Sequence, residues 1–313
     1  MRISLPFSKA RKQSAARTPG SSKLRRKETL TFWAFIGPNL LLFAVFTFWP
    51  LVASGSWSFV RWDLISPTKT WVGLGNYRKM LDDPVFWKVV RNTLWVGASA
   101  LVIRTPLALV LAVLLNRRLP GSQVFRAIIF SPRFTNKIAM AMVWAWIFDG
   151  QFGLLRAPLD LLGLTSPDWL LDTTWALPAV IIVLTWSGLG YAMVIFLSGL
   201  QSIPPVLYEA AKVDGASEWV LFSRITMPMI SPTTFFVMIT SVIGALKVFA
   251  IPNILTDGGP LWSSATYLLY LYDNAFNWFK VGYGSALAVV LFLFILLITF
   301  VQNRLSKRWV HYN

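Results

Sequence analysis

The chain has 313 residues, of which 56% are hydrophobic and only 13% are charged. Soluble domains carry roughly 25% charged residues, so this composition indicates an integral membrane protein. The absence of cysteine excludes disulfides and Cys-ligated metals. The single histidine, His311, argues against a His-based metal site or a Ser-His-Asp triad. We therefore predict neither a metal site nor catalytic residues.

The formal net charge of +16 is concentrated at the N-terminus, where nine of the 29 Lys and Arg residues precede Glu28. Few aromatic side chains accompany these charges, so we predict no nucleic-acid partner. Residues 1–30 are instead predicted to form a basic, disordered cytoplasmic arm that sets topology and touches anionic lipid.

Apolar runs of about 20 residues, the length that crosses a bilayer as a helix, occur six times. The first run is too long for a signal peptide. The fold class predicted is therefore an all-α membrane protein with six transmembrane helices within residues 31–303. The predicted spans are Phe32–Val52, Thr93–Leu115, Val124–Phe148, Ala176–Leu200, Thr226–Ile251 and Tyr283–Val301.

The distribution of Lys and Arg predicts the orientation of these spans, because cytoplasmic segments carry the excess of basic residues. The predicted inner segments hold about 16 of the 29 basic residues, and the three outer loops hold about 8. Both termini are then cytoplasmic, including the tail 304–313. The inner segments are the arm, Asn116–Gln123, Gln201–Ile225 and the tail from Arg304.

The inner segment 201–225 is the longest of the inner connections and has helix punctuation. Ser202 is predicted to cap a short helix whose first turn contains Pro204 and Pro205. Gly215 is a natural stop, because glycine adopts left-handed conformations readily. Ser217 is predicted to cap the next helical turn, and Pro228 to end the local pattern.

Small residues in this helix predict a surface that another protein can approach closely, with flanking charges that fix orientation. An ordinary amphipathic connector is the alternative, and Glu-Ala-Ala alone would not exclude it. The complete spacing is more specific. It consists of Glu209-Ala210-Ala211, then Asp214-Gly215-Ala216, then Phe222, Pro228 and Pro232.

With this spacing the sequence resembles the binding-protein-dependent permeases of ABC transporters, in particular the carbohydrate-uptake group related to the maltose and glycerol-3-phosphate permeases. Weaker similarities extend from about Phe32 to Val301. They include Val72-Gly73-Leu74-Gly75-Asn76-Tyr77, Asp83-Pro84-Val85-Phe86-Trp87, and Leu255-Thr256-Asp257-Gly258-Gly259-Pro260.

The resemblance implies that the loop is a coupling helix seated in a cleft of a separate ATP-binding subunit. It also implies two such ATPase subunits, a second homologous permease, an extracytoplasmic solute-binding protein and a bacterial or archaeal cytoplasmic membrane. No phosphate-binding loop occurs in the chain, so ATP and Mg are expected on the ATPase. The ATPase-coupling residues implied are Tyr208, Glu209, Ala210, Ala211, Asp214, Gly215 and Ala216.

Cationic and aromatic residues in or near the spans are candidates for the substrate pathway. A charge in a span costs about 2.5 kcal/mol or more, so it usually faces a cavity, a partner or the interface. Snorkelling or an inter-subunit pair is the alternative for the cations, and an interface belt or bundle packing for the aromatics. The candidates are Arg104, Arg133, Lys137, Lys247, Trp186 and Tyr191.

The stretch from Ser131 to Lys137 predicts a break in the third span, because its proline and polar residues are tolerated only beside a cavity or protein. We expect a sugar or oligosaccharide as the solute, and the cations leave open an anionic sugar or polyol derivative such as glycerol-3-phosphate. An ion-coupled secondary transporter is a further alternative. It usually needs acids or histidine within the spans, and here every acid lies outside the predicted spans.

Overall fold

The computed structural model describes residues 21–117 and 120–310. Residues 1–20, 118–119 and 311–313, and with them most of the predicted arm and the end of the predicted tail, lie outside the described residues. The chain divides into two units, Met1–Ala53 and Ser54–Asn313, which we describe separately.

The first unit is helical wherever it is described. Helix α1 (Ser21–Phe43) contains Pro38 and continues through the π-helical turn η1 (Ala44–Phe48) into α2 (Trp49–Trp57), whose last residues belong to the second unit. Residues 21–30 of the predicted arm are therefore helical. The apolar helix Arg25–Trp57 is long enough to cross a membrane, and its most apolar window has no buried residue within this chain.

The second unit begins with a small two-stranded sheet that is followed by a short helix. Strands β1 (Val60–Arg61) and β2 (Thr70–Trp71) pair antiparallel, and α3 (Gly75–Asp82) follows them. The buried Asn76 donates hydrogen bonds to the carbonyls of Ser58 and Val60, at 2.8 and 2.9 Å, which ties α3 to the chain before it.

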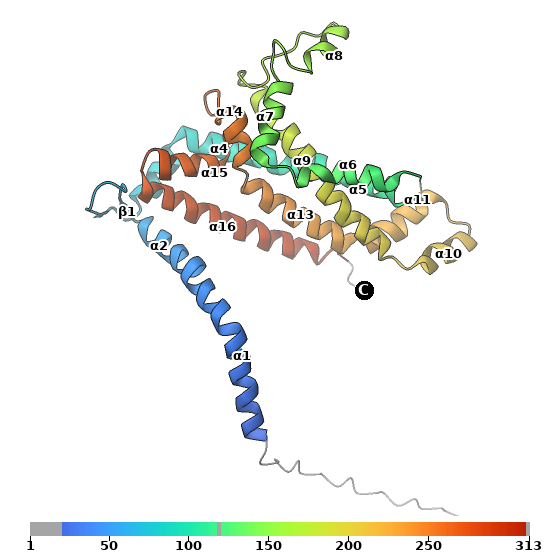
Figure 1. Ribbon diagram of the computed structural model, residues 1–313, viewed down its shortest axis with the longest axis horizontal. Helices are drawn as coiled ribbons and strands as arrows, with labels where there is room; N and C mark the ends of the chain where they lie inside the picture. Colours follow the sequence, from blue (N-terminus) through green and yellow to red (C-terminus); the bar gives the residue numbers. More distant parts are fainter. Residues whose placement is uncertain (1–20, 118–119, 311–313) are drawn as a thin grey trace, which may run out of the picture. The chain divides into compact units, whose positions relative to one another are not determined.

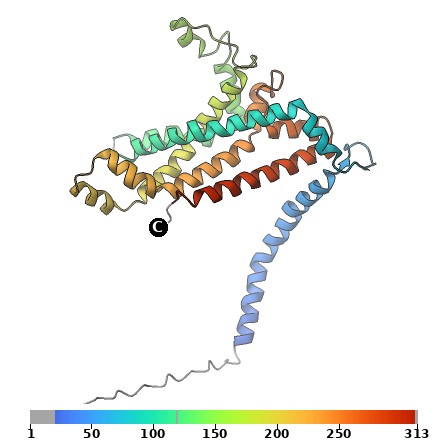
Figure 2. The same cartoon turned by 180° about the vertical axis from the view of Figure 1, so that it is seen from behind.

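Long helices form the body of the second unit. In Figures 1 and 2, α4, α13 and α16 run along one another, with β1 at one end of them and α10 and α11 at the other. The helical elements in chain order are α4 (Pro84–Ser99), η2 (Ala100–Arg104), α5 (Thr105–Asn116), α6 (Ser122–Phe130), η3 (Ser131–Arg133), α7 (Lys137–Ile147), α8 (Arg156–Leu161), α9 (Ala176–Gln201), α10 (Pro205–Val213), α11 (Glu218–Leu221), η4 (Phe222–Thr226), α12 (Met227–Met229), α13 (Ser231–Leu246), α14 (Ala250–Thr256), α15 (Tyr267–Tyr272), η5 (Asp273–Asn277) and α16 (Val281–Ser306).

Among the described residues, four helices are long and apolar enough to cross a membrane, and a bent pair would make a fifth. Besides the N-terminal helix, these are Pro84–Asn116, Ala176–Gln201 and Val281–Ser306. Each contains a predicted span, and the largest extension, at the start of Pro84–Asn116, is about two and a half turns. The count of six and the cytoplasmic termini stay predictions.

The predicted third span is not a single helix. Helix α6 ends at Phe130, η3 follows, and α7 starts at Lys137 after Asn136, whose side chain accepts a hydrogen bond from the backbone N–H of Ile138 at 2.8 Å. This confirms the predicted break. The physical cause is that Pro132 and the Asn cap begin new helical segments rather than continue the old one.

The predicted bounds of the fifth span, Thr226–Ile251, are wrong. The helical pair Glu218–Met229 and Ser231–Leu246 bends by 62° where Ile230 leaves the helix, and α14 is a separate helix after Leu246. The helix that contains Pro228 ends one residue later, at Met229, which agrees with the predicted end of the local pattern at this proline.

Helix α9 is the centre of packing in the second unit. It contacts α5, α6, α13 and α14, and its buried side chains Met193 and Phe196 belong to one apolar core with Ala108 and Ala112 of α5. A second core lies between α4, α13, α15 and α16. These two cores fix the helices around which the candidate sites lie.

The loop between α14 and α15 is fastened to α4 by side chains that satisfy its backbone. Asn92 donates to the carbonyls of Trp262 and Ala265, at 2.9 and 3.0 Å, and the hydroxyl of Thr93 accepts from the N–H of Tyr267 at 2.8 Å. Nearby, the Tyr270 hydroxyl donates to Asp83, and burial raises the pKa of this phenol, which keeps it a donor.

Close packing at Gly190 yields a stability prediction. A Cβ at this residue would lie 2.2 Å from the carbonyl oxygen of Ile129 and 2.7 Å from Cα of Phe130, and neither backbone atom moves easily. We expect Gly190→Ala to destabilise the purified chain in detergent by roughly 1–3 kcal/mol, seen as a lower thermal unfolding midpoint.

Gly97 of α4 offers a matched control. A Cβ there meets only the Cβ of Ala245 at 4.0 Å, and alanine is the better helix former by about 1 kcal/mol. Gly97→Ala should therefore leave the midpoint unchanged or raise it. Equal midpoints for the two variants would contradict the packing described for α9.

Candidate functional site

Helix α10 corresponds to the segment that the sequence singled out as a docking element. It begins with Pro205 in its first turn and ends at Val213. Its apolar residues Val206 and Val213 are 62% and 89% exposed, and Ala210 is also exposed between them. Because residues three to four apart share a helix face, these three residues form an exposed, mostly small apolar stripe, which we call the α10 stripe.

Charges flank the α10 stripe. Glu209 and Asp214 are exposed, while Ala211 and Ala216 are half-buried. The stripe is thus bordered by carboxylates in open solvent and offers no bulky obstacle to an approaching surface.

Helix α10 ends at a glycine, as the sequence predicted. Gly215 has φ of +76°, and the N–H groups of Gly215 and Ala216 donate to the carbonyls of Lys212 and Ala211, at 3.0 and 2.9 Å. This is a Schellman motif, which favours glycine because a Cβ is strained at positive φ. The Ser217 hydroxyl then accepts from the N–H of Val220 at 3.4 Å, which confirms the predicted second cap.

The predicted role of Ser202 at the start of this helix is wrong. Its hydroxyl donates to the carbonyl of Gly199 at 2.8 Å and so belongs to the end of α9. The residue that precedes α10 is Pro204, which makes no side-chain cap.

Tyr208 joins α10 to the helix that leads into the body of the protein. Its hydroxyl lies 3.0 Å from the hydroxyl of Thr226, and Thr226 donates to the carbonyl of Leu221 at 3.2 Å. Thr226 ends the π-helical turn η4, directly before α12. A displacement of α10 would therefore reach the bent pair α12–α13 through a hydrogen-bonded contact.

A hollow of about 450 Å³ lies beside this contact. It is lined by Tyr208 and Lys212 of α10, by Glu218 and Trp219 of α11, and by Asn116 and neighbouring residues at the end of α5. The two predicted inner connections, Asn116–Gln123 and Gln201–Ile225, thus lie at the same end of the helices.

A second candidate site lies within the helices and gathers three of the predicted cations. Arg104, Arg133 and Lys137 line one pocket of about 220 Å³. It is formed where η2, the broken segment η3–α7, α9 and α13 come together. The other lining residues are Val96, Ser99, Ala100, Leu184, Thr185, Ser187, Gly188, Gly244, Ala245, Val248 and Ile251.

Arg104 occupies the last position of the π-helical turn η2 and packs against Gly188 of α9. A Cβ at Gly188 would lie 2.6 Å from a guanidinium nitrogen of Arg104, so a larger residue there would force the guanidinium to shift. The buried Nε of Arg104 has no hydrogen-bond partner among the described residues. We call this pocket, which is lined by the three cations and by the hydroxyls of Ser99, Thr185 and Ser187, the cationic pocket.

The remaining pathway candidates are placed differently. The Arg133 guanidinium lies over the ring of Tyr191, 4.8 Å from its centroid, so Tyr191 supports the cationic pocket from outside. Trp186 packs edge-on against Trp144, with centroids 5.5 Å apart, and lies outside the lining. Lys247 is exposed at the end of α13 and also lies outside it.

Sequence reasoning missed the hydroxyls of this pocket. Ser99, Thr185 and Ser187 line it together with the cations. Thr185 shares a helix face with Gly188, which packs against Arg104. Serine and threonine are so common in membrane helices that this spacing carries no signal without the fold.

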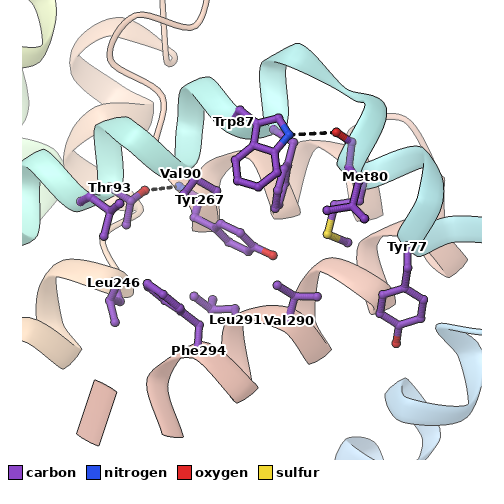
Figure 3. Close-up of a pocket in the computed structure, with 13 residues that line it drawn as sticks. Tyr77, Met80, Trp87, Val90, Thr93, Leu246, Tyr267, Val290, Leu291 and Phe294 are labelled. Atoms are coloured by element: carbon purple, nitrogen blue, oxygen red, sulfur yellow. Dashed lines mark hydrogen bonds between the residues drawn. The ribbon is translucent and has the colours of Figure 1, made fainter. Parts of the chain in front are cut away.

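An apolar cavity of about 330 Å³ lies elsewhere, between α3, α4, α15 and α16. Figure 3 shows that its lining is aromatic and aliphatic, and that the polar atoms near it are engaged: Thr93 with the N–H of Tyr267, and the Trp87 indole with the carbonyl of Leu81 at 2.9 Å. It offers a polar solute no free hydrogen-bonding group on the residues drawn.

The fold matches a solved bacterial ABC transporter involved in the import of the acidic polysaccharide alginate. The TM-score is 0.81 at 23% identity, and the match covers 93% of this chain and 99% of that one. Residues 104–311 match the family described as the binding-protein-dependent transport system inner membrane component. The chain belongs to this family of ABC transporter permeases.

Sequence relatives agree over nearly the full length of this permease. It is 36% identical to the probable ABC transporter permease protein YesP of Bacillus subtilis (strain 168), over 93% of this chain and 95% of the relative. It is 32% identical to the lactose transport system permease protein LacF of Rhizobium radiobacter, over 91% and 97%. The resemblance predicted from the sequence is thereby confirmed, and the permease is a multi-pass inner-membrane component.

The contact between Tyr208 and Thr226 yields a prediction about local stability. Tyr208→Phe removes the hydroxyl pair and keeps the ring, so α10 should open more often by about 1 kcal/mol. Hydrogen exchange read by mass spectrometry should become several-fold faster in 205–213 and stay unchanged in α9.

Tyr191→Phe is the matched control, because it removes a hydroxyl and keeps the ring that Arg133 covers. It should leave exchange of α10 unchanged. If both variants, or neither, accelerate exchange in α10, the Tyr208–Thr226 contact does not hold this helix.

Proposed function

We propose that this permease translocates a sugar or oligosaccharide as one membrane subunit of an ATP-binding-cassette importer, with the solute delivered by an extracytoplasmic binding protein. Membership in the binding-protein-dependent family supports the importer. The names of the relatives support the solute class, since LacF is a lactose permease and the matching structure imports a polysaccharide.

Helix α10 is proposed as the coupling helix, and the α10 stripe is the observation that carries this. Val213 is almost fully exposed and continues the exposed apolar surface of Val206 and Ala210, and a contiguous exposed apolar surface is typical of a site that another protein covers. A cleft on an ATP-binding subunit would accept this stripe, and the flanking carboxylates of Glu209 and Asp214 would set its orientation. Tyr208, Ala210, Ala211, Gly215 and Ala216 complete the proposed coupling set.

The proposed transmission runs from α10 to the bent pair. When ATP brings two ATPase subunits together, α10 moves with its cleft. The Tyr208–Thr226 contact then transfers the movement through η4 and α12 to α13, whose residues Gly244 and Ala245 line one side of the cationic pocket. ATP and Mg would be held by the ATPase subunits, and a second homologous permease would complete the pathway.

The proposed orientation places α10 and the end of α16 in the cytoplasm. Both lie at the same end of the long helices (Figures 1 and 2), opposite β1. The basic residues of the inner segments support this side as cytoplasmic.

Two alternatives left open by the sequence, glycerol-3-phosphate as the solute and an ion-coupled secondary transporter, receive less support. The relatives' names give no weight to glycerol-3-phosphate. An ion-coupled secondary transporter would draw its energy from an ion gradient, whereas an ABC importer draws it from ATP. A direct test separates these two energy sources. Uptake by the reconstituted complex should require ATP and survive dissipation of the proton and sodium gradients.

Enlarging the α10 stripe tests the coupling role. Ala210 is exposed, so Ala210→Trp should leave folding intact but prevent close docking. We expect ATP-dependent sugar uptake into proteoliposomes to fall at least about ten-fold, equivalent to about 1.4 kcal/mol of lost coupling, and the ATPase subunits to co-purify less well.

Ala210→Ser is the control of matched size, and it should retain uptake and co-purification. Normal uptake by Ala210→Trp, with full co-purification of the ATPase, would remove the assignment of α10 as the coupling helix.

A further inference from the structure

The cationic pocket contains more positive charge than its surroundings compensate. Arg104, Arg133 and Lys137 line a volume of about 220 Å³, and its lining residues include neither Asp nor Glu. The ion pair found among the described residues joins Arg156 and Asp160, which belong to α8. Cations in a membrane domain cost free energy unless a negative charge or a polar group compensates them. We therefore expect a negatively charged group to bind in this pocket.

Arg104 is the strongest indication of a ligand. Its guanidinium packs against the backbone of α9 at Gly188, and its buried Nε is without a hydrogen-bond partner among the described residues. A buried charged donor that lacks an acceptor has lost its hydrogen bonds to water without replacing them, which costs free energy. The guanidinium also presents a planar fork that matches an oxyanion in two parallel hydrogen bonds.

The other groups of the pocket suit a sugar ring. Ser99, Thr185 and Ser187 place hydroxyls among the lining residues, which can exchange hydrogen bonds with ring hydroxyls. Small-molecule pockets usually measure about 300–1,000 Å³. The space here, about 220 Å³, is smaller than that range, so it suits a single sugar residue rather than a longer saccharide.

We propose that the cationic pocket binds one oxyanion-bearing sugar residue, with Arg104 engaging the anion and Arg133 and Lys137 adding positive charge beside it. The inference rests on the proposed permease function and narrows its solute to acidic saccharides. Tyr191 positions Arg133 through the contact of its ring with the guanidinium.

Equilibrium dialysis with labelled glucuronate and labelled glucose tests this, because the two sugars differ in a carboxylate. The permease is used with its partner subunits in lipid nanodiscs. We expect glucuronate to bind at least about ten-fold more tightly than glucose. Arg104→Gln should weaken glucuronate about 10- to 100-fold, the effect of losing a charged hydrogen bond, and leave glucose unchanged.

Two further variants separate charge from geometry. Arg104→Lys keeps the charge but loses the fork, so it should recover only part of the preference for glucuronate. Lys247→Gln removes a cation next to the lining residue Val248 but outside the pocket, and it should bind glucuronate like the unaltered permease.

Several results would overturn the inference. These are equal affinity of the unaltered permease for the two sugars, an unchanged preference in Arg104→Gln, or competition by inorganic phosphate as strong as that of glucuronate, which would indicate a simple anion site. Loss of the second permease from purified Arg104→Gln complexes would identify the counter-charge as a partner side chain instead.

Failure of this inference is separable from failure of the proposed function. A permease that binds glucose and glucuronate alike but still imports a sugar with ATP remains a sugar permease without an anion site. A complex that imports no sugar with ATP contradicts the proposed function itself.

Discussion

Close approach of α9 to its neighbours is the constraint on which the candidate sites depend. Gly190 lets the backbone of Ile129 and Phe130 lie against α9, and Gly188 leaves room for the guanidinium of Arg104. A larger side chain at Gly190 would hold the end of α6 farther away, and a larger side chain at Gly188 would displace the guanidinium of Arg104. The cationic pocket would then lose the wall that brings cations from η2 and η3 to the same space.

The three cations of the pocket lie where helices are interrupted. Arg104 lies in a π-helical turn, and Arg133 and Lys137 border the break between α6 and α7. An interruption frees backbone groups that must be satisfied by neighbouring protein or by a water-filled space. The same interruptions that would weaken a lipid-facing helix therefore create a place where polar side chains and a polar solute can meet.

Much of this arrangement followed from the sequence, for reasons that are local. Pro132 and Asn136 are sufficient to predict the break in the third span, and Gly215 is sufficient to predict the end of α10. The bend at Ile230 was missed because the predicted span was drawn through Ser231 and Pro232, whereas Pro232 lies in the first turn of a new helix, α13. The meeting of Arg104 with Arg133 in one pocket depends on tertiary packing, since α5, a connection and α6 separate them along the chain. The prediction that Ser202 caps α10 was wrong because a serine between two helices can form its hydrogen bond with the end of the first helix or with the start of the second.

The π-helical turn η2 has a consequence for the register of its whole span. Buried positions of α4 and α5 follow one another at Val89, Val96, Ala100, Thr105 and Ala108. The step of five residues from Ala100 to Thr105 is the one that a regular α-helix would not accommodate, and the wider turn absorbs it, with the Thr105 hydroxyl donating to the Ala100 carbonyl at 2.8 Å. The inserted residue thus acts as a phase correction. It keeps one continuous contact stripe along 33 residues, although the two halves of the span serve different partners, α13 and α15 on one side and α9 on the other.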